Sequence, residues 1–262
     1  MTLLLHELKR NLKTLLIWTV CVGFMCFGCI ILFEGLEESM SGMADAYAQM
    51  GSFSTALGLD KISVSTMEGF YATEVSLIFA IGGAMFAAMT GAVILSKEEE
   101  GHTSEFLNTL PLGRGYIVVW KYLAIVILIV LFNGLNLLWI GAGFFGAGEM
   151  PPAKEFWMYH GTQLLMQLEV GSICFLVSAI CKRKQIGAAL GFAIILYVMD
   201  LMCRIVPDIE GLKYVTPYYF SNAADIFVES AVDGAMLGIS VAVTAISAAG
   251  AAVIYRTRDL AA

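Results

Sequence analysis

Six long apolar runs, separated by charged segments, constrain the fold of this chain more than any other feature of its sequence. They cover residues 15–33, 75–95, 117–145, 164–181, 186–206 and 236–255. A helix needs about 20 mainly apolar residues to cross the hydrocarbon core of a bilayer, and these runs reach or approach that length. Charged residues make up 14% of the chain, compared with roughly 25% in a soluble domain. We therefore predict an all-α, polytopic membrane protein with six transmembrane helices, folded as a single domain over residues 1–262.

The distribution of lysine and arginine predicts which side of the membrane each loop faces. Cytoplasmic loops carry an excess of these residues, and eleven of the fifteen fall on one side of a six-span arrangement. That side holds both termini and the loop at residues 96–115, which we predict to be cytoplasmic. The segments at 34–74 and 207–235 are predicted to be external, and most acidic residues lie on their side. The eleven are Lys9, Arg10, Lys13, Lys97, Arg114, Lys121, Lys182, Arg183, Lys184, Arg256 and Arg258.

Residues 1–14 have the pattern of a helix that lies in the membrane interface before the first span. Leucines are predicted on its apolar face and charged residues on its polar face. The leucines are Leu4, Leu5, Leu8 and Leu12, and the charged residues are Glu7, Lys9, Arg10 and Lys13.

The predicted external segments carry local signals of structure. Apolar residues recur at helical spacing between positions 43 and 57, which predicts one or two short helices within 34–74. The stretch 149–160 is predicted to be a short external connection, in which Trp157 and Tyr159 anchor the chain at the interface. The cluster at 214–220 is too polar and broken to span the bilayer, and too aromatic to be wholly solvated.

Three ionisable residues lie in or at the edges of the predicted spans, where such residues usually face a cavity or a partner helix. Asp200 and Arg204 are four residues apart and can form an ion pair on one helix face near the outer boundary. Glu169 has no obvious local partner. For all three, a substrate path and a structural contact remain alternative interpretations.

Residue patterns that would give this chain chemistry of its own are missing from the sequence. The phosphate-binding pattern G-x-x-x-x-G-K-[ST] does not occur. The histidines, His6, His102 and His160, fall outside the predicted spans and lack the spacing of metal ligands. Cys26 and Cys29 lie within the first span and are interpreted as small buried apolar residues. We predict no enzymatic activity and no cofactor or metal bound by this chain.

The loop at 96–115 has the features of a docking element. Its consecutive glutamates at 98–100 exclude it from hydrocarbon, so it is exposed to water. A short helix is predicted within it, capped by Thr103, favoured by Glu105 in its first turn and ended by Pro111. Its apolar stripe, suited to contact with a soluble partner, consists of Phe106, Leu107 and Leu110.

This loop resembles the first cytoplasmic loop of ABC-2 type transporter permeases. Members of that family show one or more glutamates, then Thr-x-Glu-x-Leu, then Pro-x-x-Arg. His102 stands where glycine is usual and Gly113 where serine or threonine is usual, and neither change disturbs the predicted helix. The matching residues are Glu99, Glu100, Thr103, Glu105, Leu107, Pro111 and Arg114.

The resemblance implies a permease of the bacterial plasma membrane, without its own ATPase site. The loop helix would be the coupling helix, which docks on a separate cytoplasmic ABC ATPase subunit through the matching residues together with Phe106 and Leu110. ATP and Mg would be bound by that subunit. The resemblance further implies pairing with a second permease copy, identical or related, and a segment before the last span that dips back into the outer leaflet. No nucleic acid partner is implied.

Two functions from different classes fit this sequence. The first is an exporter permease, for which the apolar spans favour a hydrophobic or amphipathic cargo such as a peptide or peptide antibiotic. The second is a non-transporting membrane scaffold or sensor that docks an ATPase through the same loop. An intramembrane enzyme is a weaker third hypothesis, because the spans offer no paired acidic and histidine residues.

Overall fold

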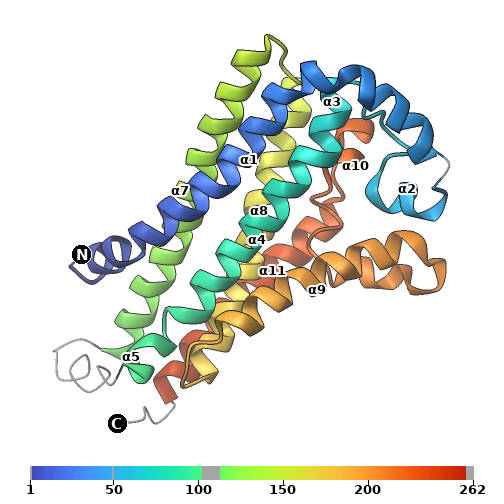
Figure 1. The fold of residues 1–262 in the computed structure, drawn as a ribbon. Coiled ribbons are helices and arrows are strands. Elements are labelled where there is room, and N and C mark those ends of the chain that lie inside the picture. The colour runs from blue at the N-terminus through green and yellow to red at the C-terminus, as the bar shows by residue number, and fades with distance from the viewer. Residues whose placement is uncertain (1, 49, 102–112, 258–262) are drawn as a thin grey trace.

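The computed structural model describes residues 2–48, 50–101 and 113–257, and over these residues the chain is a bundle of helices without strands (Figure 1). A π-helical turn, η1, leads directly into α4, and a 3₁₀ segment, η2, follows α9. The elements are α1 (Thr2–Ala48), α2 (Ser52–Leu57), α3 (Met67–Phe70), η1 (Tyr71–Val75), α4 (Ser76–Val93), α5 (Ser96–Glu100), α7 (Arg114–Ala147), α8 (Ala153–Ile180), α9 (Ile186–Ile205), η2 (Pro207–Tyr214), α10 (Ala223–Glu229) and α11 (Gly234–Thr257).

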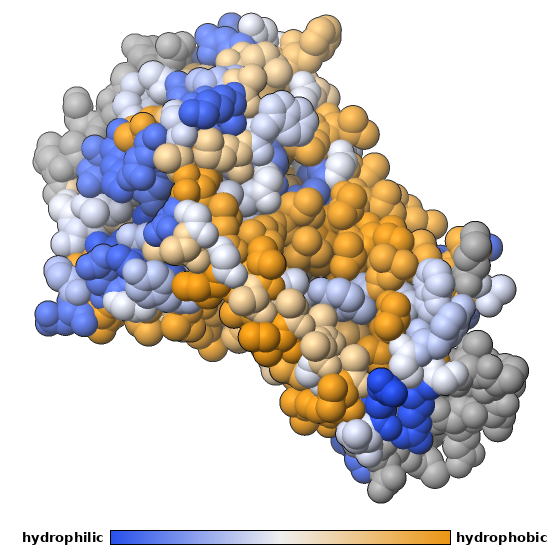
Figure 2. Space-filling model, turned by 180° about the vertical axis from the view of Figure 1, so that it is seen from behind, coloured by the Kyte–Doolittle hydropathy of each residue, from blue (hydrophilic) through white to orange (hydrophobic). Residues whose placement is uncertain are grey.

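Six helical stretches in the described residues are long and apolar enough to cross a membrane, which confirms the predicted fold class. Helices suit this environment because every backbone N–H and C=O inside a span finds its partner within the same segment. Figure 2 shows a band of hydrophobic residues between two hydrophilic ends. The stretches are Thr2–Leu36, Met67–Val93, Arg114–Ala147, Ala153–Ile180, Ile186–Ile205 and Gly234–Thr257.

Helices α4 and α8 are the most buried of the spans and form the centre of the bundle. Helix α1 packs along α7, while α9 packs along α4 and α11 along α8. Gly91 brings α4 and α8 together, because a Cβ there would lie 2.3 Å from the carbonyl oxygen of Gly171. Phe86 of α4 stacks on Phe132 of α7 with ring centroids 4.7 Å apart. Small residues therefore allow the close approach of α4 and α8, and aromatic rings fill the space between α4 and α7.

The N-terminal segment is helical as predicted, but one of its charged residues does not face water. It is continuous with α1, which changes direction near both of its ends (Figure 1). Leu4 and Leu8 pack against the core, while Leu5 and Leu12 are exposed. Glu7 is 1% exposed, so its prediction on the polar face was wrong. Its carboxylate is held by lysines from distant elements, which the pattern of this segment alone does not reveal.

Helix α8 begins earlier than the apolar run that predicted it. Gly148 ends α7 in a left-handed conformation, and α8 starts directly after Pro152, so the connection shrinks to residues 148–152. Trp157 is exposed, but Tyr159 is buried and does not act as an interfacial anchor. His160 lies inside α8 and shares a 2.8 Å hydrogen bond with the Tyr71 hydroxyl. The prediction that every histidine lies outside the spans was therefore wrong.

The segment after α9 turns back into the bundle. Residues 216–221 are largely buried, in contrast to the exposed Tyr214 and Val215 just before them. The Thr216 hydroxyl donates a 2.7 Å hydrogen bond to the Leu196 carbonyl. Leu196 lies nine residues before the end of α9, which corresponds to about 14 Å along the helix axis. We call residues 216–222 the re-entrant segment.

Candidate functional site

A cluster of four buried charges includes residues of α5, just before residues 102–112. The cluster consists of Glu7 on α1, Lys97 and Glu98 on α5, and Lys121 on α7. The Lys121 ammonium lies 2.9 Å from Glu7 Oε1 and 2.7 Å from Glu98 Oε1, and it also donates to the Ile94 carbonyl at 2.8 Å. Lys97 donates a second hydrogen bond to Glu7. We call these four residues the charge cluster.

Two positive and two negative charges balance within the charge cluster, and all four residues are less than 10% exposed. Burying such charges is expensive, and it is tolerated where each charge is paired and hydrogen-bonded. Here the pairs join three separate elements, and the paired residues lie 23 to 114 positions apart in the sequence. The cluster therefore fixes the start of the loop to both α1 and α7.

The loop base is also fixed to α8 and to the turn after it. The backbone amides of Leu95 and Ser96 both donate 3.1 Å hydrogen bonds to the Ser178 hydroxyl of α8. Glu100 accepts a 2.6 Å hydrogen bond from the Lys184 amide and lies 3.4 Å from the Lys184 ammonium. The pKa of Glu100 is lowered, chiefly by that backbone amide.

The predicted docking residues are only partly covered by the structure. Glu99 is buried on α5, Glu100 pairs with Lys184, and Arg114 begins α7. Glu100, which was predicted to dock on the ATPase, contacts a lysine of the chain itself, and so does its neighbour Glu98. The other predicted docking residues lie outside the described residues; they are Thr103, Glu105, Phe106, Leu107, Leu110 and Pro111.

Sequence reasoning missed the roles of Glu7, Lys97 and Lys121. One signal was present, because Lys121 falls inside the third predicted span at 117–145, where an ionisable residue calls for a partner. Its partners are 23 and 114 positions away. Local spacing therefore indicates that a partner exists without identifying it.

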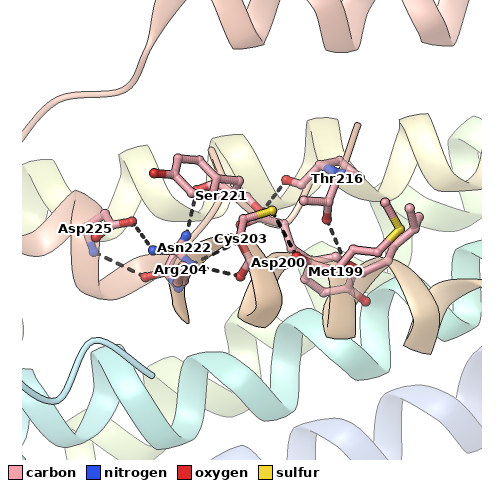
Figure 3. A network of polar contacts seen from close by, with 12 residues as sticks. Met199, Asp200, Cys203, Arg204, Thr216, Ser221, Asn222 and Asp225 are labelled. Carbon is pink, nitrogen blue, oxygen red and sulfur yellow. Dashed lines mark hydrogen bonds and ion pairs between the residues drawn. The ribbon is translucent and has the colours of Figure 1, made fainter. Parts of the chain in front are cut away.

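A second ionic cluster lies near the C-terminal end of α9. Arg204 Nε lies 3.1 Å from both carboxylate oxygens of Asp200, which confirms the predicted ion pair. Figure 3 shows Arg204 between Asp200 and Asp225, with Arg204 Nη1 2.7 Å from Asp225 Oδ2. Lys61 completes the cluster at 2.6 Å from the other Asp225 oxygen. Burial tends to raise the pKa of Asp225, but Arg204 and Lys61 outweigh it and hold that pKa below its usual value.

Arg204 also holds the re-entrant segment in place. Its Nη2 donates a 3.2 Å hydrogen bond to the Tyr219 carbonyl, and its guanidinium lies 4.5 Å from the centroid of the Tyr219 ring. One side chain thus links α9, α10 and the re-entrant segment. We therefore interpret Arg204 as a structural residue that holds these three segments together.

Glu169 makes a hydrogen bond between spans. Ser240 of α11 donates to Glu169 Oε2 at 2.6 Å, and the Glu169 side chain is buried. It also lines a small cavity with Thr216 and Phe220 of the chain after η2. Asp200 lines a different cavity. The structure therefore does not bring the three candidate substrate-path residues into one site.

Comparison with known proteins places this architecture in a family. The comparison with curated proteins returned no match. The family described as ABC-2 family transporter protein matches residues 1–260, nearly the whole chain. That match includes the six spans, the charge cluster and the loop whose motif resembles this family. The chain therefore belongs to the ABC-2 family of transporter proteins.

Proposed function

We propose that this chain is the permease subunit of an ABC exporter, driven by ATP that a separate cytoplasmic ATPase subunit binds with Mg and hydrolyses. Membership of the family supports a transmembrane transport subunit. The proposal adds the outward direction, the docking of the ATPase on the loop between α5 and α7, and pairing with a second permease copy.

The attachment of the loop base to several spans is the observation that carries this proposal. The charge cluster joins the loop base to α1 and α7, and Ser178 and Lys184 join it to the end of α8 and the following turn. A displacement of the docked loop would therefore act on α1, α7 and α8 together. A transporter driven by a soluble ATPase needs such a connection between the docking surface and the spans.

The distribution of buried charge favours a hydrophobic or amphipathic cargo, such as a peptide or peptide antibiotic. Asp200 and Arg204 neutralise each other at one end of the bundle, and the charge cluster is balanced at the other. Glu169 is hydrogen-bonded to Ser240. The buried ionic groups at both ends of the bundle are thus paired within the protein, and no ion-paired carboxylate of the described residues there carries an uncompensated charge.

Reconstitution separates the exporter from the scaffold or sensor. The full chain, combined with its ATPase in proteoliposomes, should show ATP hydrolysis stimulated by a labelled hydrophobic peptide and ATP-dependent movement of that peptide. An ATPase variant that binds ATP without hydrolysing it serves as the control. A stable complex that moves none of a panel of apolar peptides, lipids and peptide antibiotics would instead favour the scaffold or sensor.

The docking helix can be tested by adding charge to its predicted apolar stripe. Leu107→Asp should abolish co-purification of the ATPase subunit, because a carboxylate placed in an apolar groove costs on the order of 2 kcal/mol or more. Asn108→Asp adds the same charge beside the stripe and should leave the complex intact. Co-purification of both variants at the normal yield would remove this helix from the interface.

Orientation gives a separate prediction. Glu229 and Arg183 are exposed and lie near opposite ends of α8, a helix whose 28 residues span about 42 Å. In a chain without its native cysteines, Glu229→Cys should react with a membrane-impermeant maleimide on intact cells. Arg183→Cys should react only after the membrane is opened. The reverse pattern would invert the topology.

The hydrogen bond between Glu169 and Ser240 predicts different outcomes for two substitutions. Glu169→Gln keeps an acceptor of the same shape and should leave yield and cargo-stimulated ATP hydrolysis near wild type. Glu169→Leu leaves the Ser240 hydroxyl without this partner and should lower the free energy of unfolding by about 1–3 kcal/mol. If the glutamine variant instead lost cargo stimulation at unchanged basal hydrolysis, Glu169 would belong to the cargo path.

A further inference from the structure

A polar cavity lies beside the re-entrant segment, near the ionic cluster of Figure 3. Its walls come from α2, η1, α4, α8, α9, the re-entrant segment and the first residue of α10. The space between these walls, including its opening to solvent, is about 430 Å³. Its polar lining includes Thr73, Ser76, Gln163, Asp200 and Tyr218. We call this space the polar cavity.

Two buried polar atoms of the residues that line the polar cavity have no hydrogen-bond partner among the residues that the structure describes. They are Gln163 Oε1 and the Tyr218 hydroxyl, on side chains that are 1% and 4% exposed. The Gln163 amide nitrogen donates to the Ser221 carbonyl at 2.8 Å, which fixes the orientation of the amide. Buried polar groups are nearly always paired, so two unpaired atoms around one cavity indicate that a molecule within the cavity, a ligand or a water that a ligand would displace, completes them.

Two hydroxyl groups of the cavity wall, those of Thr73 and Ser76, present only acceptors. Thr73 donates its proton to the Gly69 carbonyl at 2.8 Å, and Ser76 donates to the Ala72 carbonyl at 2.6 Å. Both oxygens therefore retain lone pairs without a free proton. These residues lie at η1 and the start of α4, and π-helical turns of this kind are frequent at functional sites.

Asp200 adds a carboxylate to this acceptor-rich wall. Its oxygens accept from Arg204 but keep further lone pairs. The rings of Tyr197 and Tyr218, both in the wall, meet edge to face with centroids 5.6 Å apart. Aromatic faces attract organic cations. The matching ligand is a small, donor-rich organic cation that is held by hydrogen bonds and ring faces rather than by net charge, because Arg204 already balances Asp200.

We propose that the polar cavity binds the ammonium group of a small amine, with Gln163, Asp200 and Tyr218 as acceptors. This site is distinct from the loop that docks the ATPase and requires no ATP hydrolysis. It is therefore present in the isolated chain, and its test does not depend on the proposed exporter function.

Calorimetric titration of the purified full chain in detergent tests the proposal. The probes are propylammonium chloride and 1-butanol, a neutral molecule of similar size, both at constant ionic strength. Saturable binding of propylammonium is expected, at least about tenfold tighter than that of the alcohol, as for a hydrogen bond to a charged group. No saturable binding, or equal affinity for the two probes, would overturn the proposal.

Two matched variants localise the binding. Tyr218→Phe removes a hydroxyl that has no partner, so the protein should fold normally while its affinity for propylammonium falls about tenfold. Tyr214→Phe makes the same change at an exposed residue that is not part of the polar cavity, and should bind as wild type. Unchanged affinity in Tyr218→Phe would show that the amine binds elsewhere and would refute this site.

Discussion

Replacing Lys121 with methionine is expected to lower the free energy of unfolding by about 3–5 kcal/mol, the range for breaking a buried ion pair from one side. Lys121 is fully buried and contacts two carboxylates and one carbonyl. Its removal leaves Glu7 and Glu98 in a site that keeps Lys97 as its only cation within the charge cluster. Denaturant unfolding in detergent micelles, followed by circular dichroism, measures this loss.

Two further variants distinguish charge imbalance from lost packing. Lys184→Met breaks the exposed pair with Glu100 and should change stability little, because solvent screens such pairs. Glu7→Gln combined with Lys121→Met restores neutrality and should recover part of the stability. If the double variant is as unstable as the sum of its single changes, charge balance does not explain the effect.

Replacing Arg204 with methionine is expected to have an effect of similar size, about 3–5 kcal/mol, because it leaves Asp200 buried without its counter-charge. Arg204 also holds the Tyr219 carbonyl. The re-entrant segment should therefore become more mobile, which hydrogen exchange of its amides would show as faster exchange. Exchange in the last turns of α4, which lead towards α5 and away from this contact, should change less.

The control for Arg204 lies in the same part of the chain. Lys213→Met removes an exposed ion pair with Glu210, so it should leave both stability and exchange nearly unchanged. Adding Asp200→Asn to Arg204→Met removes the isolated carboxylate and should recover stability. Normal exchange of the re-entrant segment in Arg204→Met would show that its buried side chains suffice to hold it.

Hydropathy predicted the spans because lipid imposes one solution on the backbone, a helix of sufficient length. It did not predict where helices end, since polar residues continue a helix wherever protein surrounds them. Helix α8 illustrates this limit. Its first turns contain buried Tyr159 and His160, which the pattern assigned to an external connection. Their burial depends on Tyr71 and other aromatic rings from distant segments.

The same distinction holds for the polar contacts: those within one helix were predictable from the sequence, and those between distant segments were not. The pairing of Asp200 with Arg204 was predictable because four residues make one helical turn. The contribution of Asp225 was not, since it joins Arg204 from a separate helix after the chain has folded back. The charge cluster likewise requires the positions of α1, α5 and α7, and no periodicity within one segment contains that information.

The charge cluster has a consequence for the order of synthesis. Glu7 and Lys121 are 114 positions apart, so at about 5–20 residues per second the ribosome adds the lysine roughly 6 to 23 seconds after the glutamate. For the first 90 of those positions neither lysine partner exists, because Lys97 is the earlier of the two, and the carboxylate of Glu7 stays hydrated at the membrane surface. The N-terminus is thus the first part of the chain to be made, yet it takes its final place only after the third span has been inserted.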